Sequence, residues 1–319
     1  MANQFHVAHS GTISRLGLIA GPPYFCAQDS AITATTACMT SPNLIDMEVL
    51  YQEYESATLT GTVDSVDNLR AARVWLFSGR RDTVIDQGVM DKQFEWYAHY
   101  VDNVSQVAYF NDIEAEHAWI SDAASNPCDF LGLPYLNNCN FDAAGRMLAH
   151  LWQMPLNPSV STASLDHLHS FSQALYTLVE PADISMADVG YYYAPAECQS
   201  GSLQCRLVVF FHGCHQSSVN IGKVLMLHTG LAALAESNNL VILFPQAVAS
   251  PVAPYNPKGC WDWWSYTGED YASKSGPQIL TTVNIMRELS GYETTVGKAI
   301  DGSMPEQVAF EQFDSPTVF

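Results

Sequence analysis

The sequence predicts an α/β protein built on a mainly parallel sheet that is flanked by helices. Hydrophobic residues make up 48% of the 319 residues, which is enough for one large α/β domain with a buried core. Short continuous apolar runs also alternate with segments of helical periodicity. Such runs are typical of strands that are buried on both faces of a parallel sheet.

The first half of the chain contains three of these apolar runs. A helix over 1–9 is predicted from its apolar spacing and ends near Gly11. Residues 40–70 are polar with scattered helix formers, which indicates surface helices. A strongly periodic segment predicts a helix over 141–152. The buried strands are expected at 16–20, 73–77 and 106–110.

The second half begins with a segment that we interpret as a connector, 153–186, because prolines and Ser/Thr clusters interrupt it. A helix around 225–236 lies between two predicted strands, so the three form a βαβ unit. A further helix is expected over 278–289. The buried strands of this half are expected at 189–193, 207–211 and 240–244.

The chain is divided into a single domain over 1–292 and a polar tail of unknown role over 293–319. Acidic residues outnumber basic ones 33 to 13, and the formal net charge is −20. This charge excludes nucleic acid and anionic membranes as partners, because both need a basic surface. No apolar run approaches the length of a membrane span. We therefore expect a monomer that acts on a neutral or weakly polar substrate.

The eight cysteines predict disulfides and an oxidising compartment outside the cytoplasm. No C-x-x-C motif occurs, which argues against a zinc ribbon or a thioredoxin-like site. Short local spacings suit disulfides that staple loops, although buried free thiols and other connectivities remain open. By spacing the cysteines form three local pairs, Cys26 and Cys38, Cys128 and Cys139, and Cys198 and Cys205, and Cys214 and Cys260 remain.

Two titratable residues follow consecutive predicted strands. Asp82 comes just after the strand at 73–77, and His117 just after the strand at 106–110. Because parallel strands end at one edge of a sheet, we expect the two side chains to lie together. A carboxylate beside an imidazole is the orienting acid and the base of a hydrolytic triad. Taken singly, an aspartate on a loop is usually a cap or turn residue, and a histidine is usually structural.

A third segment, Phe210-Phe-His-Gly-Cys-His-Gln216, follows another buried strand. A His-Gly turn at a strand end can present a backbone N–H to a developing oxyanion; an ordinary turn is the alternative. His212 and His215, or His167 and His169, could bind a metal, but no third ligand is suitably spaced. We therefore expect neither a metal nor a cofactor.

The order of these segments is that of a circularly permuted α/β-hydrolase. In the ordinary order the His-Gly strand comes first, and the acid and the histidine follow the nucleophile; here Asp82 and His117 come first. A G-x-S-x-G nucleophile elbow should then stand near the start of the chain. No G-x-S-x-G occurs in the sequence. The predicted fold therefore lacks the nucleophile strand and elbow.

Several segments together resemble the extracellular polyhydroxybutyrate (PHB) depolymerases of the permuted α/β-hydrolase type. The most specific are His212-Gly-Cys-His-Gln216 and Gly259-Cys-Trp-Asp-Trp263. Supporting segments run through most of the chain. They are 1–10, 20–26, Ser78-Gly-Arg-Arg-Asp-Thr83, the loop of His117, Asn138-Cys-Asn-Phe-Asp142, 238–247 and 256–263.

The resemblance implies a role for individual residues. Asp82 would be the triad acid and His117 the triad base. Cys214 would donate one oxyanion N–H, with a disulfide to Cys260 fixing its loop. Trp261 and Trp263 would be aromatic residues of the substrate crevice, Trp263 more so, although core packing is the alternative for both. Flat aromatic faces suit a weakly polar polyester chain.

The family's serine turn, its strand and a signal peptide are not visible in the sequence. We therefore interpret Met1 as an internal methionine of a secreted serine esterase, N-terminally truncated here and inactive as given. Loss of the central strand should leave neighbouring strands without ladder partners and the fold poorly stable. The alternatives are a feruloyl or acetylxylan esterase and a polyester-binding pseudoenzyme that does not cleave its target.

Overall fold

The computed structural model of the protein describes residues 1–160, 162–290 and 316–319. An eight-stranded sheet runs through its centre, in the order β3-β2-β1-β11-β9-β10-β8-β7. Every neighbouring pair is parallel except β10 with β8 and β8 with β7. The strands are β1 (Arg15–Ile19), β2 (Arg73–Phe77), β3 (Val107–Phe110), β7 (Leu168–Ser172), β8 (Val189–Tyr193), β9 (Arg206–Val209), β10 (Leu240–Phe244) and β11 (Thr317–Val318).

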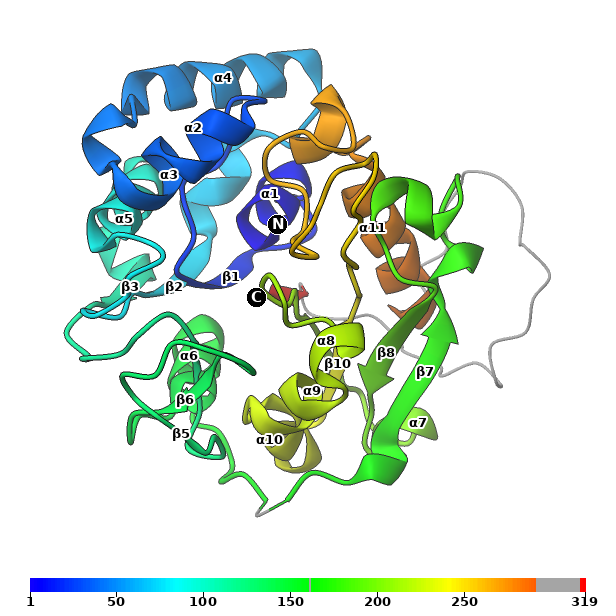
Figure 1. Cartoon of the computed structure of the whole chain (residues 1–319). Helices are drawn as coiled ribbons and strands as arrows, with labels where there is room; N and C mark the ends of the chain where they lie inside the picture. The colour runs from blue at the N-terminus through cyan, green and yellow to red at the C-terminus, as the bar shows by residue number, and fades with distance from the viewer. Residues whose placement is uncertain (161, 291–315) are drawn as a thin grey trace.

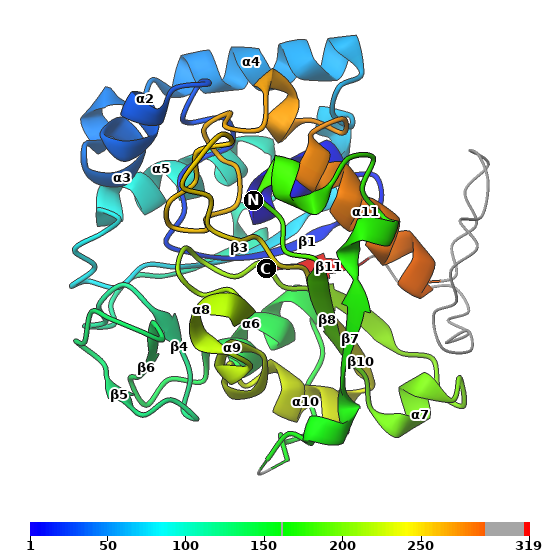
Figure 2. The same cartoon turned by 45° about the vertical axis from the view of Figure 1, so that its right-hand side comes forward.

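Helices cover both faces of this sheet (Figures 1 and 2). On one face lie α1, α4, α5 and α11, and on the other α6, α8, α9 and α10. The α-helices are α1 (Ala2–Ala8), α2 (Ala31–Thr35), α3 (Ala37–Thr40), α4 (Met47–Thr60), α5 (Gln87–Tyr100), α6 (Ala143–Trp152), α7 (Ala196–Gln199), α8 (Ser218–Ile221), α9 (Val224–His228), α10 (Leu231–Asn238) and α11 (Pro277–Ser290).

Short elements complete the described chain. A second, three-stranded parallel sheet contains β4 (Trp119–Ile120), β6 (Leu136–Asn138) and β5 (Asn126–Pro127). The 3-10 turns are η1 (Pro42–Leu44), η2 (Val66–Ala71), η3 (Val104–Gln106), η4 (Leu165–His167), η5 (Gln173–Leu175), η6 (Pro181–Ile184) and η7 (Glu269–Ala272). β4 begins two residues after His117, so this small sheet lies beside the loop that carries His117.

The core has two halves, one on each face of the large sheet. Along β2, Val74 and Leu76 belong to the cluster beneath α1, α4 and α5, whereas Trp75 and Phe77 belong to the cluster beneath α6. All four side chains are buried. Because both faces need apolar side chains, a continuous apolar run is what a central strand requires. The α/β class with a mostly parallel sheet is therefore confirmed.

The structure corrects three local predictions. The connector predicted over 153–186 contains an edge strand, β7, whose polar His169, Ser170 and Ser172 hide it from a search for apolar runs. The helix predicted over 225–236 is two helices, α9 and α10, because Gly230 adopts a left-handed conformation with φ of 87° between them. Glycine reaches that conformation without steric cost.

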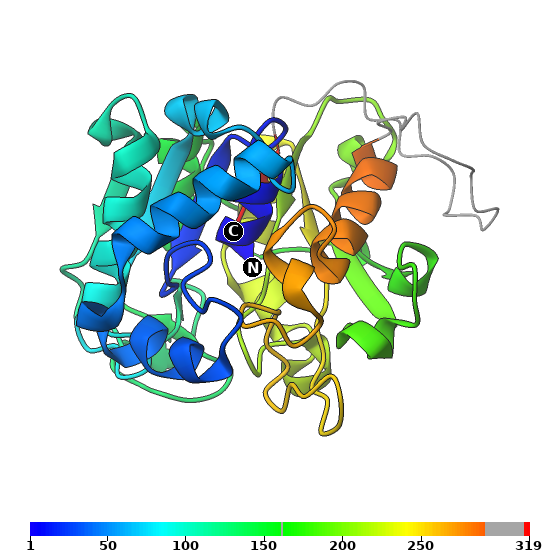
Figure 3. The ribbon, with the colours of Figure 1, turned by 90° about the horizontal axis from the view of Figure 1, so that it is seen from above.

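The third correction concerns the predicted tail over 293–319, most of which falls outside the described residues. Its last part forms β11, which lies between β1 and β9 in the centre of the sheet. Leu16 pairs with Val318 on one side, and Val209 pairs with Val318 on the other. We expected these two neighbours to lack a ladder partner; instead β11 supplies one. In Figure 3 the chain termini lie close together, and α1 contacts β11.

Four disulfides connect the loops: three are the local pairs that the spacing suggested, and the fourth joins the two remaining cysteines. They join Cys26 to Cys38, Cys128 to Cys139, Cys198 to Cys205 and Cys214 to Cys260. Among the described residues, no helix is both long and apolar enough to cross a membrane.

Candidate functional site

The loops after β2 and β3 approach each other closely and carry the predicted acid and base. Arg80 N–H donates to the carbonyl of Ile113 at 2.8 Å, and Arg81 N–H donates to that of Ala115 at 3.0 Å. Gly79 lies so near this second loop that any side chain would collide with the carbonyl oxygen of Ala115. Glycine at this position allows the close backbone approach, which brings the two loops into register.

Asp82 and His117 form a hydrogen-bonded pair at the end of these loops. Asp82 Oδ2 lies 2.9 Å from His117 Nδ1, and the side chains are 2% and 30% exposed, respectively. The other carboxylate oxygen accepts the N–H groups of Val84 at 2.9 Å and Ile85 at 2.8 Å. The carboxylate therefore cannot rotate freely, and it favours the tautomer with the proton on Nδ1. Nε2 has no hydrogen-bond partner within the described chain, so it is available as a proton acceptor.

The segment after β9 is held by a buried histidine. His212 Nδ1 donates to the carbonyl of Gly213 at 2.7 Å, and its Nε2 accepts the N–H of Ala247 at 3.0 Å. Burial lowers the pKa of His212 to about 4, so the ring is neutral near pH 7. The Gly213 carbonyl and the Cys214 N–H belong to the same trans peptide, so they point in opposite directions. The Cys214 N–H therefore points away from His212, and it has no acceptor among the described residues.

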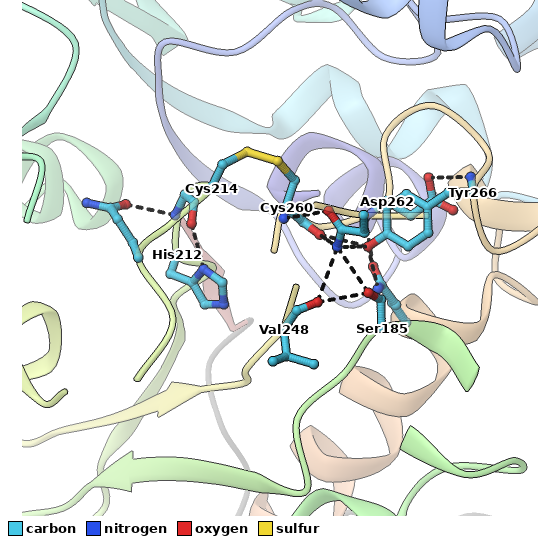
Figure 4. The surroundings of a disulfide bond; sticks show 11 residues. Ser185, His212, Cys214, Val248, Cys260, Asp262 and Tyr266 are labelled. Atoms are coloured by element: carbon cyan, nitrogen blue, oxygen red, sulfur yellow. Dashed lines mark hydrogen bonds between the residues drawn. A yellow bond between two sulfur atoms is a disulfide. The ribbon is translucent and has the colours of Figure 1, made fainter. Parts of the chain in front are cut away.

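The disulfide from Cys214 to Cys260 anchors this loop to a second one, and Figure 4 shows its surroundings. Asn256 holds the far end of the disulfide: its Oδ1 accepts Cys260 N–H at 2.9 Å, and its Nδ2 donates to the Cys260 carbonyl at 2.7 Å. The Asn256 amide also donates to Ser185 Oγ at 3.2 Å. A buried amide with this many partners fixes the backbone around it.

Gln216 connects the same loop to the segment after His117. Its Oε1 accepts the Gly213 N–H at 2.8 Å, and its Nε2 donates to the carbonyls of Pro134 and Tyr135 at 3.0 and 3.1 Å. The Tyr135 carbonyl also accepts the N–H of Trp119, two residues beyond His117. The predicted oxyanion donor and the predicted base are thus joined by a short chain of hydrogen bonds.

Comparison with known proteins identifies the family. A PHB depolymerase of Talaromyces funiculosus is 30% identical over 315 residues, which cover 92% of this chain and 87% of that protein. The chain belongs to the PHB depolymerase family. A poly(3-hydroxybutyrate) depolymerase of Delftia acidovorans is 37% identical over 88% of this chain. The chain spans 55% of the length of that relative. No family model matches the chain.

Solved structures of PHB depolymerases have the same fold. A PHB depolymerase with a serine-to-alanine substitution, complexed with an R3HB trimer, superposes with a TM-score of 0.80, at 28% identity and with 89% of this chain and 90% of that chain covered. The PHB depolymerase from Penicillium funiculosum gives 0.79 at the same identity and coverage. The resemblance to PHB depolymerases noted in the sequence is therefore confirmed.

The two tryptophans expected to line the crevice differ in exposure. Trp261 is only 4% exposed and packs edge-on against Phe211, with ring centroids 5.1 Å apart. Trp263 is partly exposed and stands perpendicular to Trp264 at a centroid distance of 5.6 Å. Contact with substrate remains a prediction for both. The exposure favours Trp263, since a buried ring has little surface to offer.

Asp262 organises the loop that carries these rings. It is 1% exposed, and burial raises its pKa while hydrogen bonds to its charged form lower it. Its Oδ1 accepts the N–H groups of Trp264, Ser265 and Tyr266 at 2.8–3.1 Å. Its Oδ2 accepts the N–H and the hydroxyl of Thr267, each at 2.7 Å. One carboxylate therefore holds four consecutive residues of the loop.

The sequence did not single out Glu116, Gln216 or Asp262 as site residues. A carboxylate one position before the predicted base was a usable signal for Glu116. The other two act through backbone contacts, which residue types alone do not reveal. Across 1–160, 162–290 and 316–319, no three His, Cys, Asp or Glu residues gather where they could hold a metal ion.

Proposed function

We propose that this chain carries the acid, the base and one oxyanion donor of a serine esterase that hydrolyses short-chain polyhydroxyalkanoates such as poly(3-hydroxybutyrate). The observation that carries the proposal is the 2.9 Å hydrogen bond between Asp82 Oδ2 and His117 Nδ1. It leaves His117 Nε2 free to accept a proton from a serine hydroxyl. The family membership supports the same reaction class.

In the proposed mechanism a serine attacks the ester carbonyl, and His117 takes its proton at Nε2. Asp82 keeps the imidazole oriented and stabilises the imidazolium that forms. The Cys214 N–H, directed by His212, donates to the oxygen on which negative charge develops. His117 then returns the proton to the leaving alkoxide. Water, activated in the same way, releases the acyl group from the serine.

The nucleophile is the part of this site that the sequence does not supply in its usual form. Residues 1–319 contain no G-x-S-x-G turn, and no serine hydrogen-bonds to His117 Nε2 in the described chain. We therefore propose that residues 1–319 alone do not hydrolyse esters. The acid–base pair and half of the oxyanion hole would leave only a small part of the rate enhancement.

Three features support a polyester substrate. A related depolymerase is complexed with an R3HB trimer, and the ester units of such a ligand carry no charge. The net charge of −20 disfavours anionic partners. Trp263 offers an apolar face. We further propose a monomer with a single domain, to which the C-terminal strand β11 also belongs. Four disulfides favour export to an oxidising compartment.

The test is butyrate-ester hydrolysis by residues 1–319, beside the same chain carrying His117→Ala. We expect no activity above the variant. A strand and G-x-S-x-G turn grafted ahead of α1, in place of β11 at the centre of the sheet, should then produce activity that His117→Ala abolishes. Activity of the ungrafted chain that His117→Ala removes would show that a serine within the chain is the nucleophile.

The substrate class needs a separate comparison. The grafted chain should release soluble products from poly(3-hydroxybutyrate) film and none from feruloylated xylan. Ferulate release without polyester cleavage would favour the carbohydrate esterase instead. Adsorption to the film with no cleavage by either form would favour the non-catalytic binding protein.

A further inference from the structure

Glu116 lies directly before the predicted base and joins the two loops of the site. Its Oε1 accepts the His117 N–H at 2.7 Å and the Thr83 N–H at 2.8 Å. Its Oε2 accepts the Thr83 hydroxyl at 3.0 Å. Thr83 is the residue directly after Asp82. One carboxylate therefore binds the backbone of the base and the backbone next to the acid.

The burial of Glu116 distinguishes it from the ion pairs that Glu114 forms with Arg80 and Arg81. Glu116 is 8% exposed. Glu114, two residues earlier, pairs with Arg80 and Arg81, but each of these three side chains is more than half exposed. Exposed ion pairs contribute little to stability, whereas hydrogen bonds from backbone N–H groups to a buried carboxylate are short and strong. Glu116 is thus the side chain best placed to fix the distance between the loops.

The remaining contacts of Asp82 show what this link adds to the backbone bonds between the two loops. Its Oδ1 is engaged by the N–H groups of Val84 and Ile85, in its own loop. These bonds fix the carboxylate within that loop, but they do not fix the loop relative to His117. The Asp82–His117 bond is made between side chains, and the His117 side chain is 30% exposed. The backbone bonds of Arg80 and Arg81 join the two loops before these residues, and Glu116 adds a buried connection directly beside the acid and the base.

We propose that Glu116 is a positioning residue that holds His117 in hydrogen-bonding register with Asp82. Its acceptor oxygens provide this function, rather than its charge. The importance of the positioning for catalysis rests on the proposed esterase function, but the positioning itself does not. It can therefore be measured without turnover, and its outcome is independent of whether residues 1–319 hydrolyse any ester.

The experiment is nitrogen-15 NMR of the His117 ring in residues 1–319, assigned by comparison with His117→Ala. In the parent chain we expect the Nδ1-protonated tautomer, with a slowly exchanging proton. Glu116→Ala removes all three hydrogen bonds, so its Nδ1 proton should exchange with water at least about tenfold faster, the factor that the loss of even one hydrogen bond to a charged group would give. The ring should then populate both tautomers.

Two matched variants separate geometry from charge. Glu116→Gln keeps a carbonyl oxygen for the two N–H groups, and the Thr83 hydroxyl can rotate to accept from the new amide. It should therefore retain the parent tautomer and exchange rate. Glu114→Ala removes an exposed carboxylate from the same loop and should also behave like the parent. If Glu116→Gln behaved like Glu116→Ala, the role assigned to the acceptor oxygens would be wrong.

A milder variant keeps the test decisive if Glu116→Ala does not fold. Thr83→Val removes only the hydroxyl bond to Oε2 and leaves both backbone bonds in place. We expect faster Nδ1 exchange than in the parent, with the same dominant tautomer. An Nδ1 proton that exchanges as in the parent in Thr83→Val, and in Glu116→Ala if that variant folds, would overturn the proposal, even if the grafted chain proved to be an active esterase.

Discussion

At the scale of single residues, buried polar side chains fix the loops of the site. His212, Gln216, Asn256 and Asp262 each bond to backbone groups of loops. A buried polar group without partners costs about 1–3 kcal/mol. Each of these residues therefore stabilises the fold only when its buried polar atoms all have hydrogen-bond partners. This requirement makes such loops specific in shape, and it makes their anchoring residues sensitive to substitution.

Asp262 gives the clearest prediction at this scale. Asp262→Ala leaves five donors of residues 264–267 without their acceptor. We expect the free energy of unfolding to fall by about 3 kcal/mol, because hydrogen bonds to charged groups are worth about 1.5–3 kcal/mol each and solvent will replace some of them. Urea denaturation measures this loss. Tryptophan fluorescence should also report greater mobility of Trp263 and Trp264.

The control for this prediction is Asp270→Ala, which removes an exposed carboxylate from the following turn, η7. It should change stability by less than about 0.5 kcal/mol, as surface substitutions usually do. Equal losses of stability in the two variants would mean that the change in net charge causes the loss. The hydrogen bonds of Asp262 would then not be what orders the loop.

At the scale of elements, β11 is the least expected part of the fold. It is two residues long, yet it occupies the centre of the sheet, and Val318 is fully buried. The bonds continue past the strand: Phe319 N–H donates to the Val209 carbonyl and the Phe319 carbonyl accepts Phe211 N–H, each at 2.8 Å. The segment joins β1 and β9, which would otherwise face each other across a gap.

We therefore predict that deleting residues 316–319 destabilises the sheet at its centre. The Phe211 N–H and the Val209 carbonyl would lose their partners, at about 1–3 kcal/mol each. Hydrogen exchange at Phe211 should accelerate far more than exchange along β2, which β11 does not touch. Val318→Ala is the milder companion, with an expected cost of about 1–2 kcal/mol for the lost apolar contacts. Unchanged exchange at Phe211 would contradict the pairing.

The elements also show how far the sequence predicts this fold. β1, β2, β8 and β10 were predicted within a residue, because each is an apolar run with little polar interruption. The pairing of Asp82 with His117 was predicted from strand ends alone. β11 was not predicted, because a strand of two residues is too short to show a hydrophobic pattern. The anchoring role of Glu116 depends on the distance between two loops, which no local pattern encodes.

At the scale of the whole molecule, buried histidines link stability to pH. Burial lowers the pKa of His6 from 6.5 to about 3 and that of His212 from 6.5 to about 4. Below pH 6.5 the unfolded chain therefore binds protons that the folded chain does not, so the free energy of unfolding falls as the pH falls. The fall continues to about pH 4 for His212 and about pH 3 for His6. Asp262, whose pKa burial raises, acts in the opposite direction.

The last prediction tests this linkage with one substitution. Between about pH 6 and 4, each buried imidazole should contribute a slope of up to about 1.4 kcal/mol per pH unit. His6→Phe removes one of them, and also the 2.8 Å hydrogen bond between His6 Nδ1 and the Tyr97 hydroxyl. The absolute stability will therefore change, but the informative quantity is the slope, which should decrease by about that amount in urea denaturation across the pH series. His99→Phe, at an exposed position, should keep the parent slope. A His6→Phe slope equal to that of the parent would show that His6 is not the buried, neutral group on which this prediction depends.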